Sequence, residues 1–207
     1  MSAPVTLLIS KSDLVGVVPQ FSANIDTNHF AASNLYANER LKNMIPSELY
    51  DAILTVYSLS AWASGTAYVS GNQVVFNSRG YEANQSTSAG QSPATHASKW
   101  DEIEMYSVWR DYFKPFLCWQ AYAKFLPFHG ILSTQGGIKQ HLDLSSEPVP
   151  NERLGSAITN AQQTADGYFM DFQKYMGDNS WTIDTVRYNL SDTKNTFRPK
   201  LRIGIVK

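Results

Sequence analysis

Apolar residues change their spacing twice along this chain, near residues 62 and 103, and these changes divide the chain into three parts. Between residues 24 and 59 the apolar positions recur every three or four residues, which is typical of amphipathic helices. Pro46 divides this stretch, because proline fits the first turn of a helix better than its interior. Two helices joined near Pro46 are therefore predicted.

Residues 62–103 contain short β-like runs separated by glycine, serine, threonine and asparagine. Ser70-Gly71-Asn72 and Asn77-Ser78-Arg79-Gly80 are typical turn sequences. A segment of roughly 40 residues lies near the lower limit for independent folding, so it needs aromatic packing or support from its neighbours. We expect a compact β module, inserted between helices.

Helical spacing returns at Met105 and continues to Phe128, with a kink or break predicted at Pro115. Aromatic and apolar residues surround nearly the whole of this helix. Such a helix must be buried on most sides, either at the centre of one chain or between subunits.

Residues 130–144 predict a β-hairpin that turns at Gln135-Gly136-Gly137. A last helix is predicted over 151–176, with Asn151 as its N-cap and Gly177 as its stop.

The predicted fold class is therefore α+β, with a mainly α-helical body, a small inserted all-β module and extended termini. The body takes residues 1–61 and 104–207, and the module takes residues 62–103.

The C-terminal segment, residues 194–207, carries five basic residues and no acidic residue. Leu201, Ile203 and Ile205 alternate within it as they would in a strand. A basic, β-like arm of this kind is typical of a segment that pairs with a partner.

The charge balance excludes some classes of protein. The chain has 17 Lys and Arg against 18 Asp and Glu, a net charge of −1, whereas nucleic-acid binders usually carry a basic surplus. No apolar run approaches the roughly 18 residues that span a bilayer, and the first residues lack the order of a signal peptide. We expect a soluble, intracellular protein without a membrane partner.

Residues with catalytic or metal-binding chemistry are scattered. Cys118 lies between Leu117 and Trp119, where a small buried side chain is expected rather than a nucleophile. Glu102 and Glu104 would diverge on a helix and make a poor acid–base pair. The histidines lack the paired spacing that a metal site favours: His29, His96, His129 and His141. We expect no enzymatic activity, no cofactor and no metal site.

The β segment carries an ordered set of motifs: Trp62, Tyr68-Val69-Ser70-Gly71-Asn72-Gln73-Val74, Gly80-Tyr81-Glu82-Ala83, Gly90-Gln91-Ser92-Pro93 and Trp100. In this order the motifs closely resemble the small chitin-binding carbohydrate-binding modules of families 5 and 12. The resemblance implies a glycan ligand, with aromatic faces stacked on pyranose rings. Trp62, Tyr81 and Trp100 are the best stacking candidates.

The same aromatics could serve packing alone, because a core this small needs them. Enzyme-associated modules of this type commonly end in two adjacent tryptophans, whereas Asp101 follows Trp100 here. The alternative interpretation is that the module binds no sugar and is a structural decoration of the helical body.

The helical parts carry a second set of motifs: Tyr36-Ala37-Asn38-Glu39-Arg40-Leu41, Met44-Ile45-Pro46-Ser47-Glu48-Leu49-Tyr50-Asp51, Trp109 to Leu126, Ser133-Thr134-Gln135-Gly136-Gly137-Ile138, and Ala161 to Gly177 followed by Asn179. Their order is similar to that in head–tail connector (adaptor) proteins of tailed phages, especially phages of Bacteroidota. The turn at Pro46-Ser47-Glu48-Leu49-Tyr50 lacks the glycine that is usual there.

This second resemblance implies a structural virion protein of the head–tail neck, assembled in the cytoplasm of the host bacterium. It implies a homo-oligomeric ring of twelve copies that binds the portal protein and further neck or tail proteins. DNA would pass through the lumen.

In such a ring the C-terminal arm is expected to reach the portal and add a strand to it. The residues predicted to make this contact are Arg198, Lys200, Leu201, Arg202 and Ile203. The alternatives are an arm that lines the DNA channel and an arm that is merely solvated.

The sequence leaves two alternatives to the connector function. One is a glycan-binding adhesion module on a helical scaffold, which explains only the β segment. The other is an enzyme such as a chitinase fragment, which needs paired carboxylates at hydrolytic separation. The connector is the function that the sequence favours.

Overall fold

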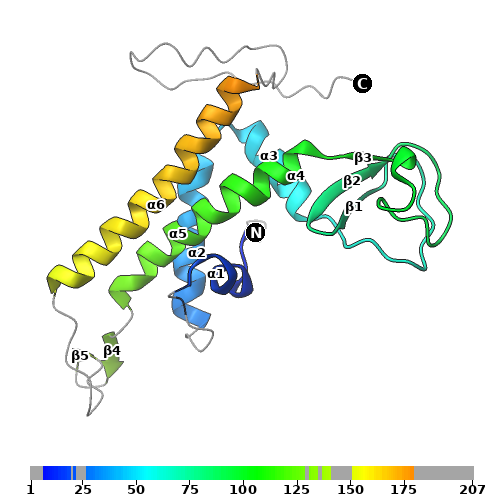
Figure 1. The fold of residues 1–207 in the computed structure, drawn as a ribbon. Coiled ribbons are helices and arrows are strands. Elements are labelled where there is room, and N and C mark those ends of the chain that lie inside the picture. The colour runs from blue at the N-terminus through cyan, green and yellow to red at the C-terminus, as the bar shows by residue number, and fades with distance from the viewer. Residues whose placement is uncertain are drawn as a thin grey trace. The chain divides into compact units, whose positions relative to one another are not determined.

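The computed structural model describes residues 7–19, 21, 27–128, 131–134, 137–140 and 151–179. Most of the described chain is helical, and the largest sheet has three antiparallel strands (Figure 1). The α+β fold class with a mainly helical body is thereby confirmed. The elements in chain order are α1 (Lys11–Val17), α2 (Thr27–Met44), α3 (Ser47–Tyr57), β1 (Gln73–Phe76), β2 (Arg79–Ala83), a 3-10 turn (Ala97–Lys99), β3 (Trp100–Glu102), α4 (Glu104–Val108), a π-helical segment (Trp109–Phe113), α5 (Lys114–Phe125), a second 3-10 turn (Leu126–Phe128), β4 (Ile131–Thr134), β5 (Gly137–Gln140) and α6 (Asn151–Asp178).

Contacts divide the described chain into two compact units. The helical unit runs up to Ile45 and resumes at Tyr112, and the module unit is Pro46–Asp111. The module unit extends beyond the predicted module, 62–103, at both ends, because α3 and α4 pack together and α4 packs against β2.

In the helical unit, α5 is the central helix and packs against α1, α2 and α6. The aromatic helix predicted from the sequence is therefore buried at the centre of one chain, and its burial requires no second subunit. The buried residues of α5 are Pro115, Phe116, Leu117, Cys118, Gln120, Ala121, Ala123 and Phe125.

Pro46 and Pro115 both lie at or next to the start of a helix. α2 ends at Met44 and α3 begins at Ser47, so the predicted division at Pro46 is confirmed. Pro115 lies in the first turn of α5, directly after the π-helical segment. The predicted break therefore lies before Pro115, in the wider π-helical turn of Trp109–Phe113. Proline itself is tolerated in the first turn of α5, because its missing N–H has no helical partner there.

In the module unit, β1, β2 and β3 form an antiparallel sheet in that order. Phe76 pairs with Arg79, which leaves a two-residue turn at Asn77 and Ser78. Both turn residues have positive φ, 49° and 59°, as a type I′ hairpin turn requires. The turn predicted at Asn77-Ser78-Arg79-Gly80 is confirmed.

The C-terminal half follows the predicted order but differs at one helix end. β4 pairs with β5 around the predicted turn, which confirms the hairpin. α6 begins at Asn151 itself and continues to Asp178, so Gly177 lies inside its last turn and is not the stop. Glycine ends a helix only where the backbone turns left-handed, and α6 continues past this position. The arm at 194–207 lies outside the described residues.

Candidate interaction surfaces

The three predicted stacking aromatics belong to one cluster in the module unit. Tyr68, Val74, Ala83 and Trp100 form its buried core, and Trp62 and Tyr81 pack against this core. Trp100 is only 5% exposed. Its ring lies edge-on to Tyr68 at 5.4 Å, and its Nε1–H donates to the Gln91 carbonyl oxygen at 3.2 Å. Trp100 is therefore a core residue, and its ring faces are not free to stack on a sugar.

Trp62 and Tyr81 are half-buried. The Trp62 ring lies edge-on to Phe76 at 5.4 Å, and its buried Nε1–H has no hydrogen-bond partner within the described part of the chain. These two residues retain partial exposure, whereas the third member of the predicted platform does not. Trp100, which a sugar-binding platform would need at the surface, is buried in the small core of the module.

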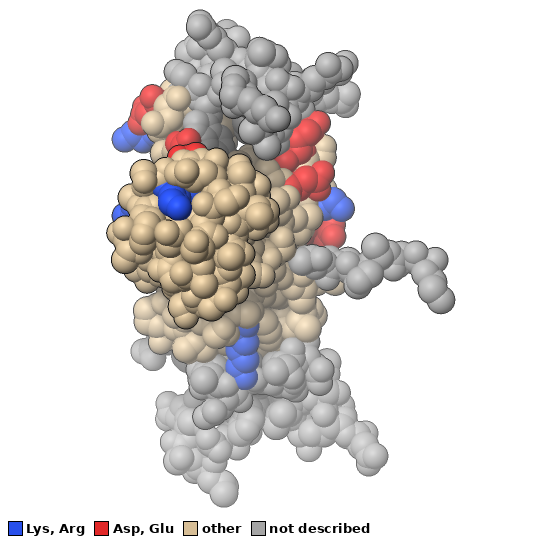
Figure 2. Space-filling model, turned by 90° about the vertical axis from the view of Figure 1, so that its right-hand side faces the viewer, with Lys and Arg blue, Asp and Glu red and all other residues tan. Residues whose placement is uncertain are grey.

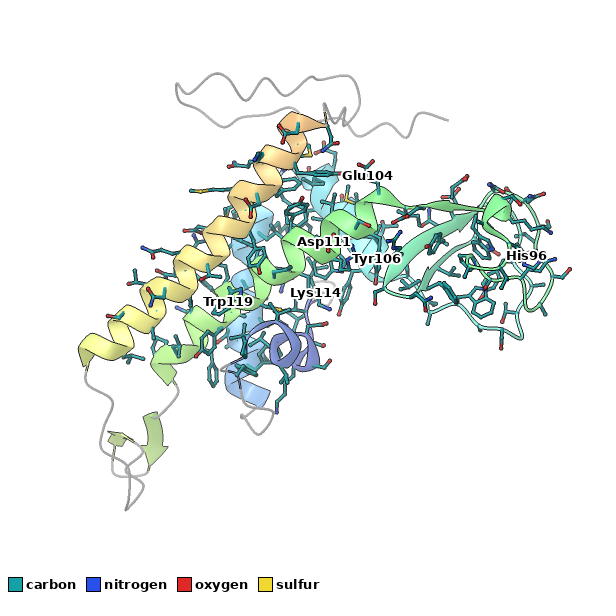
Figure 3. All side chains as sticks on the ribbon, in the orientation of Figure 1. His96, Glu104, Tyr106, Asp111, Lys114 and Trp119 are labelled. Carbon is teal, nitrogen blue, oxygen red and sulfur yellow. The ribbon has the colours of Figure 1, made fainter. Side chains whose placement is uncertain are left out.

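The outer surface of the module carries little charge (Figure 2). Between Ser58 and Ser98 the sequence has one Arg, Arg79, one Glu, Glu82, and one His, His96, and no Lys or Asp. Val69 is 60% exposed in the loop that precedes β1. His96 lies in the loops at the end of the module opposite α4, where its Nδ1 is 2.9 Å from the Thr95 hydroxyl (Figure 3).

Arg110 connects the helical part of the module unit to its hairpin, a role that spacing in the sequence did not suggest. Its Nη1–H donates to the Ser78 carbonyl oxygen at 2.6 Å, and its other donors reach both oxygens of Asp111 at 2.7 Å. The hydrogen bond that Arg110 donates to Asp111, opposed by burial, raises the pKa of Arg110 above its ordinary value. Only the tertiary fold brings this guanidinium to the turn, because 32 positions separate the two residues.

A polar network crosses the helical unit. Arg40 on α2 donates to Gln120 Oε1 at 3.0 Å and to Asp166 Oδ1 at 3.2 Å. Gln120 is 1% exposed at the centre of α5, and Asp166 lies on α6. Because a buried amide needs partners, this network sets the register of the three helices against one another.

Cys118 is buried in α5. Burial, with a smaller contribution from Asp13, raises the pKa of its thiol to about 12. The side chain therefore remains a thiol at neutral pH, as the sequence predicted for a small buried residue.

Within the described ranges, no three His, Cys, Asp or Glu side chains gather where they could hold a metal ion. None of the described helices combines the length and the apolar character that crossing a membrane would need.

Large apolar side chains are exposed on both outer helices of the helical unit. Leu35 and Tyr36 on α2 are 41% and 42% exposed, and Met170 on α6 is 65% exposed. Leu35 and Tyr36 are adjacent in sequence, whereas Met170 lies on the other outer helix. The predicted portal contacts lie outside the described residues, so the structure does not describe Arg198, Lys200, Leu201, Arg202 or Ile203.

Residues 83–196, just over half of the chain, match a family of unknown function, DUF6712. The chain belongs to this family. The DUF6712 region begins at the last residue of β2 and includes β3 and α4 to α6, so it covers parts of both units. No curated protein and no solved structure matches the chain.

Proposed function

We propose that this protein is a structural subunit of the head–tail connector of a tailed phage, a ring that docks onto the portal and links it to the tail. The observation that carries the proposal is the order of the elements: two helices, a β insertion, an apolar helix, a β-hairpin and a last amphipathic helix. The connector proteins that the sequence resembles have the same order of helices and hairpin without the β insertion, which interrupts the match.

The exposed apolar side chains of α2 and α6 support the same function. A ring subunit must present apolar surface to its neighbours, and the two outer helices of the helical unit do so. We propose a homo-oligomeric ring of twelve copies in the neck of the virion, assembled in the cytoplasm of the host bacterium. Its partners are the portal protein and further neck or tail proteins, with DNA passing through the lumen.

Electron microscopy of the full chain in negative stain, alone and mixed with the portal protein of the same phage, tests this function. The expected result is rings, seated on portals in the mixture. Monomers of 23.1 kDa that do not bind portals would overturn it.

A truncation after Thr193 tests the proposed role of the C-terminal arm, which contains Arg198, Lys200, Leu201, Arg202 and Ile203. The truncated protein should form rings but fail to dock, because the strand-adding segment and its positive charges are lost. The full chain should dock less well as salt rises, since screening weakens the attraction of the arm to acidic surface. Normal docking by the truncated protein would show that the attachment lies elsewhere.

Glycan binding by the module unit is the alternative function, and it depends on Trp62 and Tyr81 because Trp100 is buried. A glycan array that includes chitin oligosaccharides tests it with the full chain. Binding that Tyr81→Ala abolishes without loss of folding would support a glycan ligand. An array without signal would leave the module as a structural decoration.

A further inference from the structure

The helical unit is a layer of helices with α5 between α2 and α6. The residue pairs in contact show the relative direction of neighbouring helices. In an antiparallel pair, successive contacts involve rising residue numbers on one helix and falling residue numbers on the other. The α2–α5 contacts include Tyr36–Lys124 and Arg40–Gln120, and the α5–α6 contacts include Phe116–Phe169 and Gln120–Asp166. α5 is therefore antiparallel to both outer helices, and α2 and α6 are parallel to each other.

The face of α2 that points away from α5 is exposed and mixes apolar and charged side chains. Phe30, Ala37 and Leu41 are buried on the inner face. At 100° per residue the opposite side carries the exposed residues Ala31, Ala32, Leu35, Glu39 and Lys42.

The face of α6 that points away from α5 has a different composition. Ala161, Ala165 and Phe172 are buried on the inner face. The opposite side carries the exposed residues Thr159, Gln163, Met170 and, one turn further on, Lys174, with the exposed Asp171 on its flank. Met170, at 65% exposure, lies at the centre of this face.

The Arg40–Asp166 ion pair, 3.2 Å long, sets residues 40 and 166 at the same level along the two parallel helices. With a rise of about 1.5 Å per residue, Leu35 lies level with residue 161, between Thr159 and Gln163. By the same count Lys42 lies within about one turn of Asp171. At 100° per residue, Lys42 and Asp171 both lie on the side of the helical layer opposite the Arg40–Asp166 pair. The two residues therefore have opposite charges, similar positions along the helix axes and the same side of the layer.

We infer that the outer face of α2 binds the outer face of α6 of a second copy of this chain. The inference rests on the proposed ring and identifies its subunit contact. Leu35 packs between Thr159 and Gln163 of the neighbouring copy, and Lys42 pairs with its Asp171. Because the two faces differ, the contact is head-to-tail and repeats α2–α5–α6 layers around an axis along the helices until the ring closes.

A charge exchange between the two faces tests the contact in the full chain. Lys42→Glu and Asp171→Lys, each alone, should raise the protein concentration needed for ring assembly about tenfold, because like charges then meet at every subunit contact. The double variant K42E/D171K should restore assembly toward the wild-type concentration. Asp51→Lys on α3, an exposed charge outside both faces, is the matched control and should leave assembly unchanged.

A disulfide test gives a readout that does not depend on affinity. The double variant L35C/Q163C should form covalent multiples of 23.1 kDa on oxidation, whereas each single variant should not. The native Cys118 should not interfere, because it is buried. Far-UV circular dichroism checks that every variant is folded.

The outcomes separate the contact from the proposed function. Wild-type rings with no effect of the charge variants, or with no rescue in the double variant, would overturn this contact and leave the connector function intact. A wild-type chain that forms no ring, alone or with portals, would overturn both.

Discussion

Asp13 shows how one side chain can join a short helix to the core. Its carboxylate accepts from the backbone N–H and the hydroxyl of Ser10, at 2.8 and 2.7 Å, and forms an ion pair of 2.5 Å with Lys114 of α5. The Ser10 hydroxyl in turn accepts from the Asp13 N–H, which completes a capping box at the start of α1. α1 has only seven residues, so its stability depends on this cap and on contact with α5.

Asp13→Asn should make the protein less stable at neutral pH by about 1–2 kcal/mol. Burial alone would raise the pKa of Asp13, but the hydrogen bonds from Lys114 and Ser10 outweigh it, and the pKa lies below the ordinary 3.8. The stabilisation by the carboxylate is therefore present above that ordinary value and is lost as the pH falls through the lowered pKa.

Urea unfolding measured at pH 7 and well below pH 3.8 checks this prediction. The wild type and the Asn variant should differ at pH 7 and converge in acid. An equal difference at both pH values would show that the carboxylate charge is not the source.

At the scale of elements, β2 and α4 approach so closely that only glycine fits between them. A Cβ built on Gly80 would lie 2.6 Å from Cβ of Tyr106, which is labelled in Figure 3. Tyr106 cannot move its Cβ without moving α4. This contact, together with the Arg110 bond to the hairpin turn, holds the sheet and the helix of the module unit together.

Gly80→Ala should destabilise the protein by about 1–3 kcal/mol, since overpacking forces backbone shifts. Gly65→Ala is the matched control, because nothing lies within 4 Å of a Cβ at that position. Thermal unfolding followed by near-UV circular dichroism would measure both. A Gly80→Ala variant as stable as the control would mean that β2 and α4 do not pack this closely.

At the scale of the whole molecule, each unit has its own buried cluster. The helical unit buries α5 with α1, α2 and α6, and the module unit buries the cluster around Trp100. Both crossings of the chain between units fall at interruptions of the α-helical pattern, one at Ile45–Pro46 and one in the π-helical segment. The units should therefore be separable.

Replacing Pro46–Asp111 by a Gly/Ser linker should leave the helical unit folded, because α1, α2, α5 and α6 pack against one another within this unit. A strong far-UV helical signal and one cooperative thermal transition are expected. A flat, non-cooperative melt would contradict the separation. Replacing only residues 62–103 should destabilise the remaining part of the module unit, α3 and α4, because α4 would lose the sheet against which it packs.

Much of the local structure could be predicted from sequence because its causes are local. Pro46 separates α2 from α3, and Asn77 and Ser78 accept the left-handed turn. The periodicity of apolar residues predicts both α5 and α6 as helices and, for α6, identifies the inner face. Proline, turn residues and apolar spacing restrict φ and ψ within a few residues, whatever surrounds them.

The candidate surfaces depended on contacts between distant residues, and for these the tertiary structure was decisive. Trp100 and Tyr81 carry the same aromatic signal in sequence, yet packing buries Trp100 and leaves Tyr81 half-exposed. The apolar surface of α5 predicted burial on most sides, but only the fold shows that α1, α2 and α6 of the same chain provide it. Arg40 and Asp166, 126 positions apart, set the level at which α2 and α6 can meet a neighbour. Local residues determine how each segment folds, whereas the packing of segments against one another decides which side chains remain available to a partner.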